Sequence, residues 1–366
     1  MKRLVNRKLS DFNIKGALQT LSGSSSFANP NEESLNTLQQ KHPQAPDYLK
    51  LPPTPDADTP LICFSTDQIR AAISSFPHGS GAGPDGLRPQ HLKDCISITA
   101  GDASTSLFTS LMELVNYLAN GHLPTDLRPF LYGAQLHGLC KSNGDHRPIA
   151  VGCTDRCLVA NICLRPFIPR LHKLLLLSQV GVGIPLGYEA AVHTTCYFMD
   201  QLHNNKVLKL DVKNAFNSIR RDTVLQEAQK YLPEIYPFIW DCYSSKTSLF
   251  HGNFSLDSAT SVQQVDPLGP AVFALAIHEV TSKIKADLNI WYLDAGCIGG
   301  DPQTMLTNAT MIRDSLSTRR LAWRFIILNV IYSLSITQTS TCPKQASSFK
   351  TNSHPSLYLT LLIGSF

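Results

Sequence analysis

Two aspartates stand where the sequence predicts the ends of strands. Asp211 follows the mostly apolar residues 207–210, and Asp294 lies at the tip of a predicted hairpin over 289–300. Carboxylates presented from neighbouring strands of one sheet can hold two divalent ions about 3.5–4 Å apart, as two-metal phosphoryl transfer requires. The alternative is that each aspartate is an ordinary residue at the end of a strand.

Two cations flank a second predicted turn. Lys141 and Arg147 lie on either side of Asn143-Gly144-Asp145, which would join a strand over 130–139 to one over 147–151. This arrangement can present two positive charges to a polyphosphate, although a hairpin with both cations in solvent is an alternative. The Gly-rich stretch at 79–86 is not a P-loop, because no Gly-Lys-Ser/Thr follows it.

The elements around these residues predict an α+β fold. Val207–Val212 reads as a short strand, and apolar residues recur at three and four positions over 268–284, which indicates a helix. Ser65 or Thr66 can cap a helix that runs to Phe76. A further helix over 107–120 stops at Gly121, and its predicted apolar face consists of Leu107, Leu111, Leu114, Val115 and Leu118.

Composition favours a globular protein with a core. The chain has 366 residues, of which 43% are hydrophobic and 16% charged, and its net charge of +4 is compatible with a nucleic-acid partner without requiring one. The apolar stretches 174–177 and 325–336 are shorter than the roughly 20 residues that span a bilayer. The basic N-terminus has no apolar run after it, so we expect no secretory signal and no membrane partner. The sequence predicts a soluble intracellular protein and leaves nucleus or cytoplasm open.

The cysteines predict free thiols. Ten occur and none forms a Cys-x-x-Cys pair. Their tightest group, Cys153, Cys157 and Cys163 with His172 beyond, is an irregular zinc-ligand pattern, and the alternative is buried thiols in a reducing compartment.

Both ends of the chain look unlike the middle. Residues 1–60 lack apolar periodicity and end in a Pro-rich stretch, which predicts a poorly ordered arm and linker with at most a short helix near 11–21. Beyond Asp314 the chain has no Asp or Glu but keeps five Lys and Arg residues. We interpret this tail as either a basic element that faces nucleic acid or poorly ordered chain.

Five short segments resemble, in order, the boxes of a reverse transcriptase of the non-LTR (LINE-like) retrotransposon type. The resemblance covers roughly residues 60–300. The segments are Phe76-Pro77 with Gly83-Pro84-Asp85-Gly86-Leu87-Arg88-Pro89, the stretch from Lys141 to Ile149, Leu210-Asp211-Val212-Lys213-Asn214-Ala215-Phe216-Asn217-Ser218, Val262-Gln263-Gln264-Val265-Asp266-Pro267-Leu268-Gly269-Pro270, and Tyr292-Leu293-Asp294-Ala295.

The resemblance implies a right-hand polymerase. Fingers would cover 61–200 and the palm 201–315, with an antiparallel sheet backed by helices, chiefly the one over 268–284. An incomplete thumb, or disordered chain, would occupy 316–366. The implied activity is RNA-directed DNA polymerisation by two-metal nucleotidyl transfer, with an RNA template, a DNA primer and dNTPs as partners.

The resemblance also implies roles for single residues. Asp211 and Asp294 would be catalytic and would bind two Mg²⁺ or Mn²⁺ ions, with the Val212 carbonyl as a further ligand. Lys141 and Arg147 would contact the triphosphate of the incoming nucleotide. Phe216 would be a steric gate that excludes the ribose 2′-hydroxyl of a ribonucleotide; the alternative is that Phe216 is an ordinary core side chain. Gln264 would lie near the nucleotide and the primer end.

Three departures from the family pattern fall in the same centre. Ala295 replaces the second Asp of the Tyr-x-Asp-Asp box, which removes a ligand and a negative charge. Val265 replaces a Gly that would allow close backbone approach or positive φ. Tyr332 occupies the position of an expected Lys. The sequence therefore predicts an impaired or inactive enzyme, with a non-catalytic nucleic-acid binder, or a chain that never folds stably, as alternatives.

Overall fold

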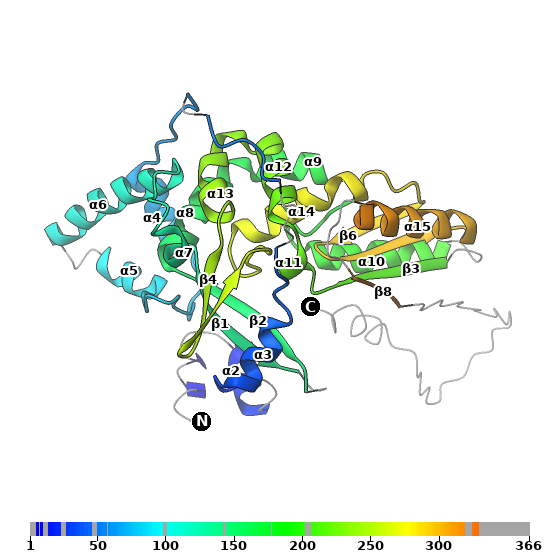
Figure 1. Ribbon diagram of the computed structural model, residues 1–366, viewed down its shortest axis with the longest axis horizontal. Coiled ribbons are helices and arrows are strands. Elements are labelled where there is room, and N and C mark those ends of the chain that lie inside the picture. The colour runs from blue at the N-terminus through cyan, green and yellow to red at the C-terminus, as the bar shows by residue number, and fades with distance from the viewer. Residues whose placement is uncertain are drawn as a thin grey trace, which may run out of the picture.

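The structure, a computed structural model, describes the chain except for residues 1–4, 7, 10–13, 23–26, 46–49, 57, 98–100, 142–143, 177, 202–205, 319–323 and 329–366. Helices and two four-stranded sheets make up the described part, with the first sheet near the middle of Figure 1 and the second to the right. Helices and mainly antiparallel strands in one chain agree with the predicted α+β class. No described helix is long and apolar enough to cross a membrane.

The first sheet is mixed and has the strand order β2-β1-β4-β5. Its β1–β2 hairpin is the predicted one, and β1 also pairs in parallel with β4. The predicted start of β1 at Phe130 is wrong, because Arg128–Leu131 form the short helix α7. Pro129 favours that helix, since its fixed φ suits a first turn. The strands are β1 (Ala134–Cys140), β2 (His146–Gly152), β4 (Thr247–His251) and β5 (Phe254–Ser258).

The second sheet is antiparallel throughout and has the order β6-β7-β3-β8. Its strand β3 (Lys206–Lys213) and its hairpin of β6 (Leu288–Tyr292) and β7 (Ala295–Gly300) confirm the strand and hairpin that the sequence predicts. The turn consists of Leu293 and Asp294 alone. Ala295 therefore begins β7. A tip over Asp294-Ala295-Gly296, which the sequence also predicts, is wrong by this assignment. The edge strand β8 (Arg324–Leu328) falls inside the predicted tail.

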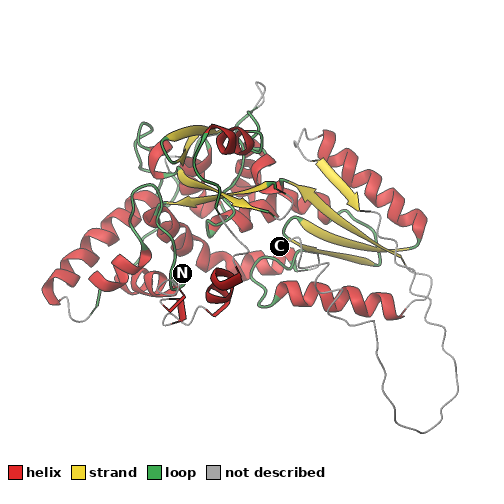
Figure 2. Ribbon diagram, turned by 90° about the horizontal axis from the view of Figure 1, so that it is seen from below, coloured by secondary structure: helices red, strands yellow, loops and turns green. Residues whose placement is uncertain are grey.

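Helices cover both faces of the second sheet (Figure 2). On one face, the side chain of Thr195 in α10 (Gly187–Gln201) bonds to Cys297 of β7. On the other, Ile298 packs in the main core with Ile312 of α15 (Pro302–Thr318). Alternation of side chains along a strand places Asp211 on the face of α10, because Asp211 pairs with Ala295 and Ala295 shares a face with Cys297.

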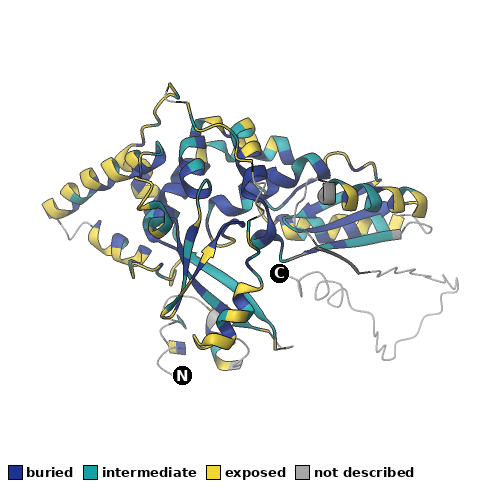
Figure 3. Cartoon of the chain, in the orientation of Figure 1, coloured by how far each residue is buried: buried dark blue, intermediate teal, exposed yellow. Residues whose placement is uncertain are grey.

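One main core runs through the molecule. Its buried residues extend from Phe64 to Ile312 and occupy the centre in Figure 3. The core therefore crosses the predicted boundary between 200 and 201, and the first sheet does so too, since β1 and β4 lie on either side of it. The helices around it are α8 (Thr154–Leu164), α9 (Ile168–Leu175), α11 (Ala215–Ser218), α12 (Arg221–Tyr231), α13 (Tyr236–Tyr243) and α14 (Leu268–Thr281), with short 3₁₀ turns η2 (Arg165–Phe167) and η3 (Pro233–Ile235).

Three helices cluster at the far left of Figure 1, namely α4 (Thr66–Ser75), α5 (Pro89–Cys95) and α6 (Gly101–Ala119). The predicted cap of α4 is confirmed, since Ser65 and Gln68 each bond to the other's backbone N–H. In α6 the predicted apolar face is correct except at Leu114, which is 39% exposed.

The N-terminal region is more ordered than the sequence predicted. It contains α2 (Ile14–Ser22) and α3 (Glu32–Gln39), and α3 lies against β2 (Figure 1). Leu38 is fully buried in a second small core against β1 and β4. The Asn214 side chain, which follows β3, donates to the carbonyl of Lys41. Packing of this kind joins residues distant in sequence, so the local composition of the arm did not reveal it.

Candidate active site at one end of the second sheet

Asp211 and Asp294 lie at the same end of the second sheet. Asp211 pairs with Ala295 in the β3–β7 ladder, and Asp294 is the turn residue immediately before Ala295. The Val212 N–H donates to the carbonyl oxygen of Asp294 at 3.4 Å. A residue in an antiparallel ladder directs its N–H and its C=O to the same neighbour. The Val212 carbonyl, a predicted metal ligand, therefore faces the Asp294 turn as well.

The two carboxylates and one cation act on each other electrostatically. The pKa of Asp294 is raised to about 6, chiefly because the carboxyl is withdrawn from solvent, and the negative charge of Asp211 adds to the shift. Arg147 in β2 opposes it. Three of the predicted site residues, in strand β3, in strand β2 and in the β6–β7 turn, are thus close enough for Asp211 and Arg147 to act on the pKa of Asp294.

The donor set fits a divalent cation of the Mg²⁺ or Mn²⁺ type. Two carboxylates and a backbone carbonyl supply the hard oxygen ligands that these ions prefer. A cation between Asp211 and Asp294 would offset the repulsion that contributes to the raised pKa of Asp294. Among the described residues there is no cluster of three or more His, Cys, Asp or Glu side chains that could bind a metal. A cation at this pair would therefore take its remaining ligands from backbone, water or substrate oxygens.

Lys141 lies on the same face of the β1–β2 hairpin as Arg147. The Lys141 N–H donates to the Asp145 carbonyl, and Leu139 pairs with Arg147, so residues 141 and 147 point to one side of the hairpin. The Lys141 side chain is 41% exposed, and its ammonium nitrogen lies 3.5 Å from the carboxylate of Asp145. Burial acts to raise the pKa of Asp145, but the hydrogen bond from Lys41, the hydrogen bond from the His146 N–H and the charges of Lys41 and Lys141 together lower that pKa overall. Lys41, from the N-terminal region, was not among the predicted site residues.

Phe216 and Gln264 differ in their surroundings. The ring of Phe216 is 5% exposed and stacks on Phe273 of α14 at 4.4 Å between centroids. Packing in the core is enough to explain the burial and the stacking of this ring, so the role of Phe216 as a steric gate stays a prediction. Gln264 is exposed. The Val262 N–H donates to the Phe216 carbonyl, which holds the segment before Gln264 against the residues that follow β3.

Val265 does not adopt the positive φ that the Gly expected at this position would allow. Its φ is not positive, and its side chain is 53% exposed. The expected strain is therefore absent from this position, and what remains is a branched apolar side chain on the surface. The third departure, Tyr332, lies outside the described residues.

Two buried polar groups near the site were missed by sequence reasoning. Arg156, in the first turn of α8, pairs with Asp266 at 2.6 Å, and both side chains are 1% exposed. Asp266 also accepts from the Leu268 N–H at the start of α14. The second group is Gln179, whose side chain bonds to both backbone groups of Leu293. Gln179 follows a run of leucines, and a polar residue there was the signal available, but it does not identify a partner. Arg156 follows Thr154 and Asp155, so its sequence surroundings gave no such signal.

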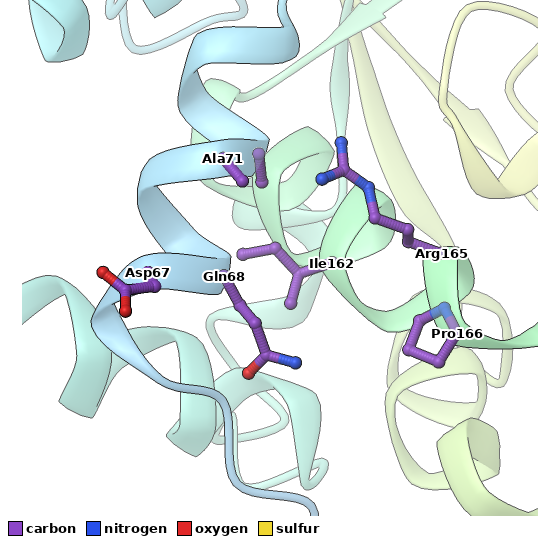
Figure 4. A pocket seen from close by; sticks show the side chains of 7 residues that line it. Asp67, Gln68, Ala71, Ile162, Arg165 and Pro166 are labelled. Carbon is purple, nitrogen blue, oxygen red and sulfur yellow. The ribbon is translucent and has the colours of Figure 1, made fainter.

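A separate cavity of about 260 Å³ lies between α4 and α8 (Figure 4). None of the predicted site residues lines it. Its wall comprises Asp67, Gln68, Ala71, Ala72, Ile162, Arg165 and Pro166. The Cys153–Cys163 group shows no metal-like arrangement, and every cysteine in the described ranges is a free thiol.

No protein-family model matches this chain, and no curated protein matches it significantly.

Proposed function

We propose that this chain is the fingers–palm portion of an intracellular reverse transcriptase that extends a DNA primer on an RNA template. The observation that carries the proposal is the approach of Asp211 and Asp294 at one end of an antiparallel sheet, with Arg147 beside them. The order of the five sequence boxes supports it, since the first and last palm-like boxes supply these two aspartates. Arrangement and order together favour nucleotidyl transfer over a chance pair of strand ends.

In this proposal the chain's own residues bind ions and position the nucleotide. Asp211, Asp294 and the Val212 carbonyl hold Mg²⁺ or Mn²⁺. When bound, the ions activate the primer 3′-hydroxyl and stabilise the leaving pyrophosphate. Arg147 and Lys141 supply positive charge for the dNTP triphosphate. Gln264 would face the nucleotide from the exposed segment before α14.

Ala295 makes the proposed enzyme a weak one. It begins β7 directly opposite Asp211 and is 8% exposed, so a carboxylate at this position would face the same site. Because Ala295 has no carboxylate, the site has two carboxylates where the reverse transcriptases that this chain resembles have three. Loss even of groups that only orient metal ligands lowers affinity or activity about 10–100-fold, and loss of a ligand should lower it at least as much.

Primer extension with Mn²⁺ tests the proposal. We expect little or no extension by the chain as it stands, and a gain of at least 10-fold after Ala295→Asp. Val265→Gly should add less, because Val265 shows no positive φ. Asp211→Asn in the Ala295→Asp background is the control and should abolish the gain. Catalysis by this centre would be rejected if neither Ala295→Asp alone nor Ala295→Asp combined with Val265→Gly extended a primer.

A second candidate function is a non-catalytic nucleic-acid binder that keeps the polymerase groove. Ala295 at the site, together with the burial of Phe216, favours it. Binding to an RNA–DNA duplex should then weaken steeply between 50 and 200 mM salt, because phosphate contacts release counterions. Equal affinity at both salt concentrations would rule out this function.

A further inference from the structure

The turn that carries Asp294 has a sequence poorly suited to its shape. Two-residue hairpin loops favour Gly, Asn or Asp where φ is positive. Here Leu293 occupies the first turn position with φ of +54°. A side chain with a Cβ costs about 1–2 kcal/mol in that conformation. Such a residue keeps its conformation only where the surroundings impose it.

Gln179 supplies that constraint from outside the hairpin. Its Oε1 accepts from the Leu293 N–H at 2.7 Å, and its Nε2 donates to the Leu293 carbonyl at 3.1 Å. Both backbone groups of the strained residue are therefore satisfied by one side chain. The same Oε1 accepts from the Gly181 N–H at 3.0 Å, which fixes the amide in one orientation. Gln179 is 1% exposed, so water cannot readily replace these bonds.

The backbone around Gln179 is itself attached to the hairpin. Trp291 in β6 donates its N–H to Ser178 at 2.6 Å and accepts from the Val180 N–H at 2.8 Å. These two bonds make residues 178–180 a short parallel extension of the sheet edge. Gly181 completes the fit, because a Cβ there would lie 2.8 Å from Leu293 Cγ. The turn is thus held by a rigid neighbour on one side.

We propose that Gln179 is a positioning residue that holds the Leu293–Asp294 turn so that the Asp294 carboxylate stands beside Asp211. Its link to metal binding rests on the proposed function above, whereas its link to the shape of the turn does not. Removing the amide takes away the partners of the N–H and the carbonyl of Leu293, both of which are part-buried. The turn then relaxes toward negative φ, and Asp294, its second residue, moves with it.

The test compares two substitutions of buried or half-buried glutamines in the full chain. Gln179→Met keeps the length of the side chain but removes its three bonds. Gln135→Met is the matched control, since Gln135 donates to the Phe250 carbonyl at 2.9 Å in the first sheet, away from the turn. We expect Gln179→Met to weaken Mn²⁺ binding, measured by electron paramagnetic resonance of the free ion, by about 10-fold or more. Gln135→Met should leave Mn²⁺ affinity unchanged.

A rescue separates positioning from general stability. Leu293→Gly removes the strain of positive φ, so the turn no longer needs Gln179. Adding Gln179→Met to Leu293→Gly should then change Mn²⁺ affinity less than twofold. Equal losses in both backgrounds, or a Gln179→Met chain that binds Mn²⁺ as the native chain does, would overturn the proposal.

Hydrogen exchange distinguishes failure of this proposal from failure of the proposed function. Gln179→Met should accelerate exchange in the segment 291–296 without any metal, because the Leu293 N–H loses its acceptor. If the native chain binds no Mn²⁺ but exchange accelerates, the metal site is wrong and the positioning role stands. If exchange in that segment is unchanged, the positioning role is wrong whatever the chain binds.

Discussion

The substitution Ala295→Asp should lower the stability of the metal-free protein and increase the stabilisation that Mn²⁺ gives on binding. Asp211 and Ala295 are cross-strand partners, so the Cβ atoms of Asp211 and a new Asp would lie about 4.5–5.5 Å apart on one face. At roughly 5 Å and an effective dielectric constant of about 20, two negative charges repel by about 3 kcal/mol. Partial exposure of Asp211 screens this repulsion, which leaves about 1–3 kcal/mol.

The assay is thermal unfolding of the Ala295→Asp chain with and without Mn²⁺. For a domain of roughly 150–250 residues, each 1 kcal/mol shifts Tm by about 2–4 °C, so Ala295→Asp should lower Tm by several degrees in metal-free buffer. An ion at 100 times its Kd stabilises the folded state by about 2.7 kcal/mol, enough to restore most of that loss. Repulsion raises the pKa of the new carboxyl, so its penalty is absent at low pH and grows as the pH rises.

Ala295→Asn is the matched control because it adds nearly the same volume without charge. It should lower Tm through crowding at this buried position and gain no more from Mn²⁺ than the native chain does. If the Asp and Asn variants unfold alike at every Mn²⁺ concentration, position 295 and Asp211 do not share a cation. The reasoning about the missing ligand would then be refuted.

Three further outcomes follow from the site and its surroundings. Mn²⁺ affinity of the native chain should fall about tenfold per pH unit below about 6, because only the ionised Asp294 binds metal; an affinity that is flat down to pH 5 would contradict this. Arg147→Gln should move that midpoint to higher pH, since Arg147 opposes the rise in the pKa of Asp294, and no movement would place Arg147 away from the site. Asp266→Asn should lower the free energy of unfolding in urea by about 3–5 kcal/mol, because the buried Arg156 loses its charged partner, whereas Glu279→Gln at the exposed Lys283 pair should change it by less than about 1 kcal/mol.

Local signals predicted the elements that carry the site. The mostly apolar residues before Asp211 predicted strand β3, and the hairpin predicted over 289–300 corresponds to β6 and β7. Away from the site, Ser65 as one of two candidate caps predicted the start of α4. Each of these signals lies within a few residues of the structure it specifies. The proximity of Asp211 and Asp294 was expected from the family resemblance rather than from either strand alone.

Features that depend on distant partners were not predictable in the same way. Gln179 is 114 positions before Leu293 in the chain, and nothing in its local sequence names that partner. The N-terminal region likewise gains its order from the packing of Leu38 on the first sheet. For Val265 the family pattern suggested strain, but the backbone adopts an ordinary φ and leaves the side chain exposed.

The most direct test of the central claim is a crystal structure of the native chain soaked with Mn²⁺ and measured at a wavelength where manganese scatters anomalously. We predict an anomalous peak about 2.0–2.3 Å from carboxylate oxygens of both Asp211 and Asp294. A peak within reach of the Val212 carbonyl would add the third expected ligand. No peak between the two aspartates, with manganese bound only at other carboxylates, would contradict the account of this site.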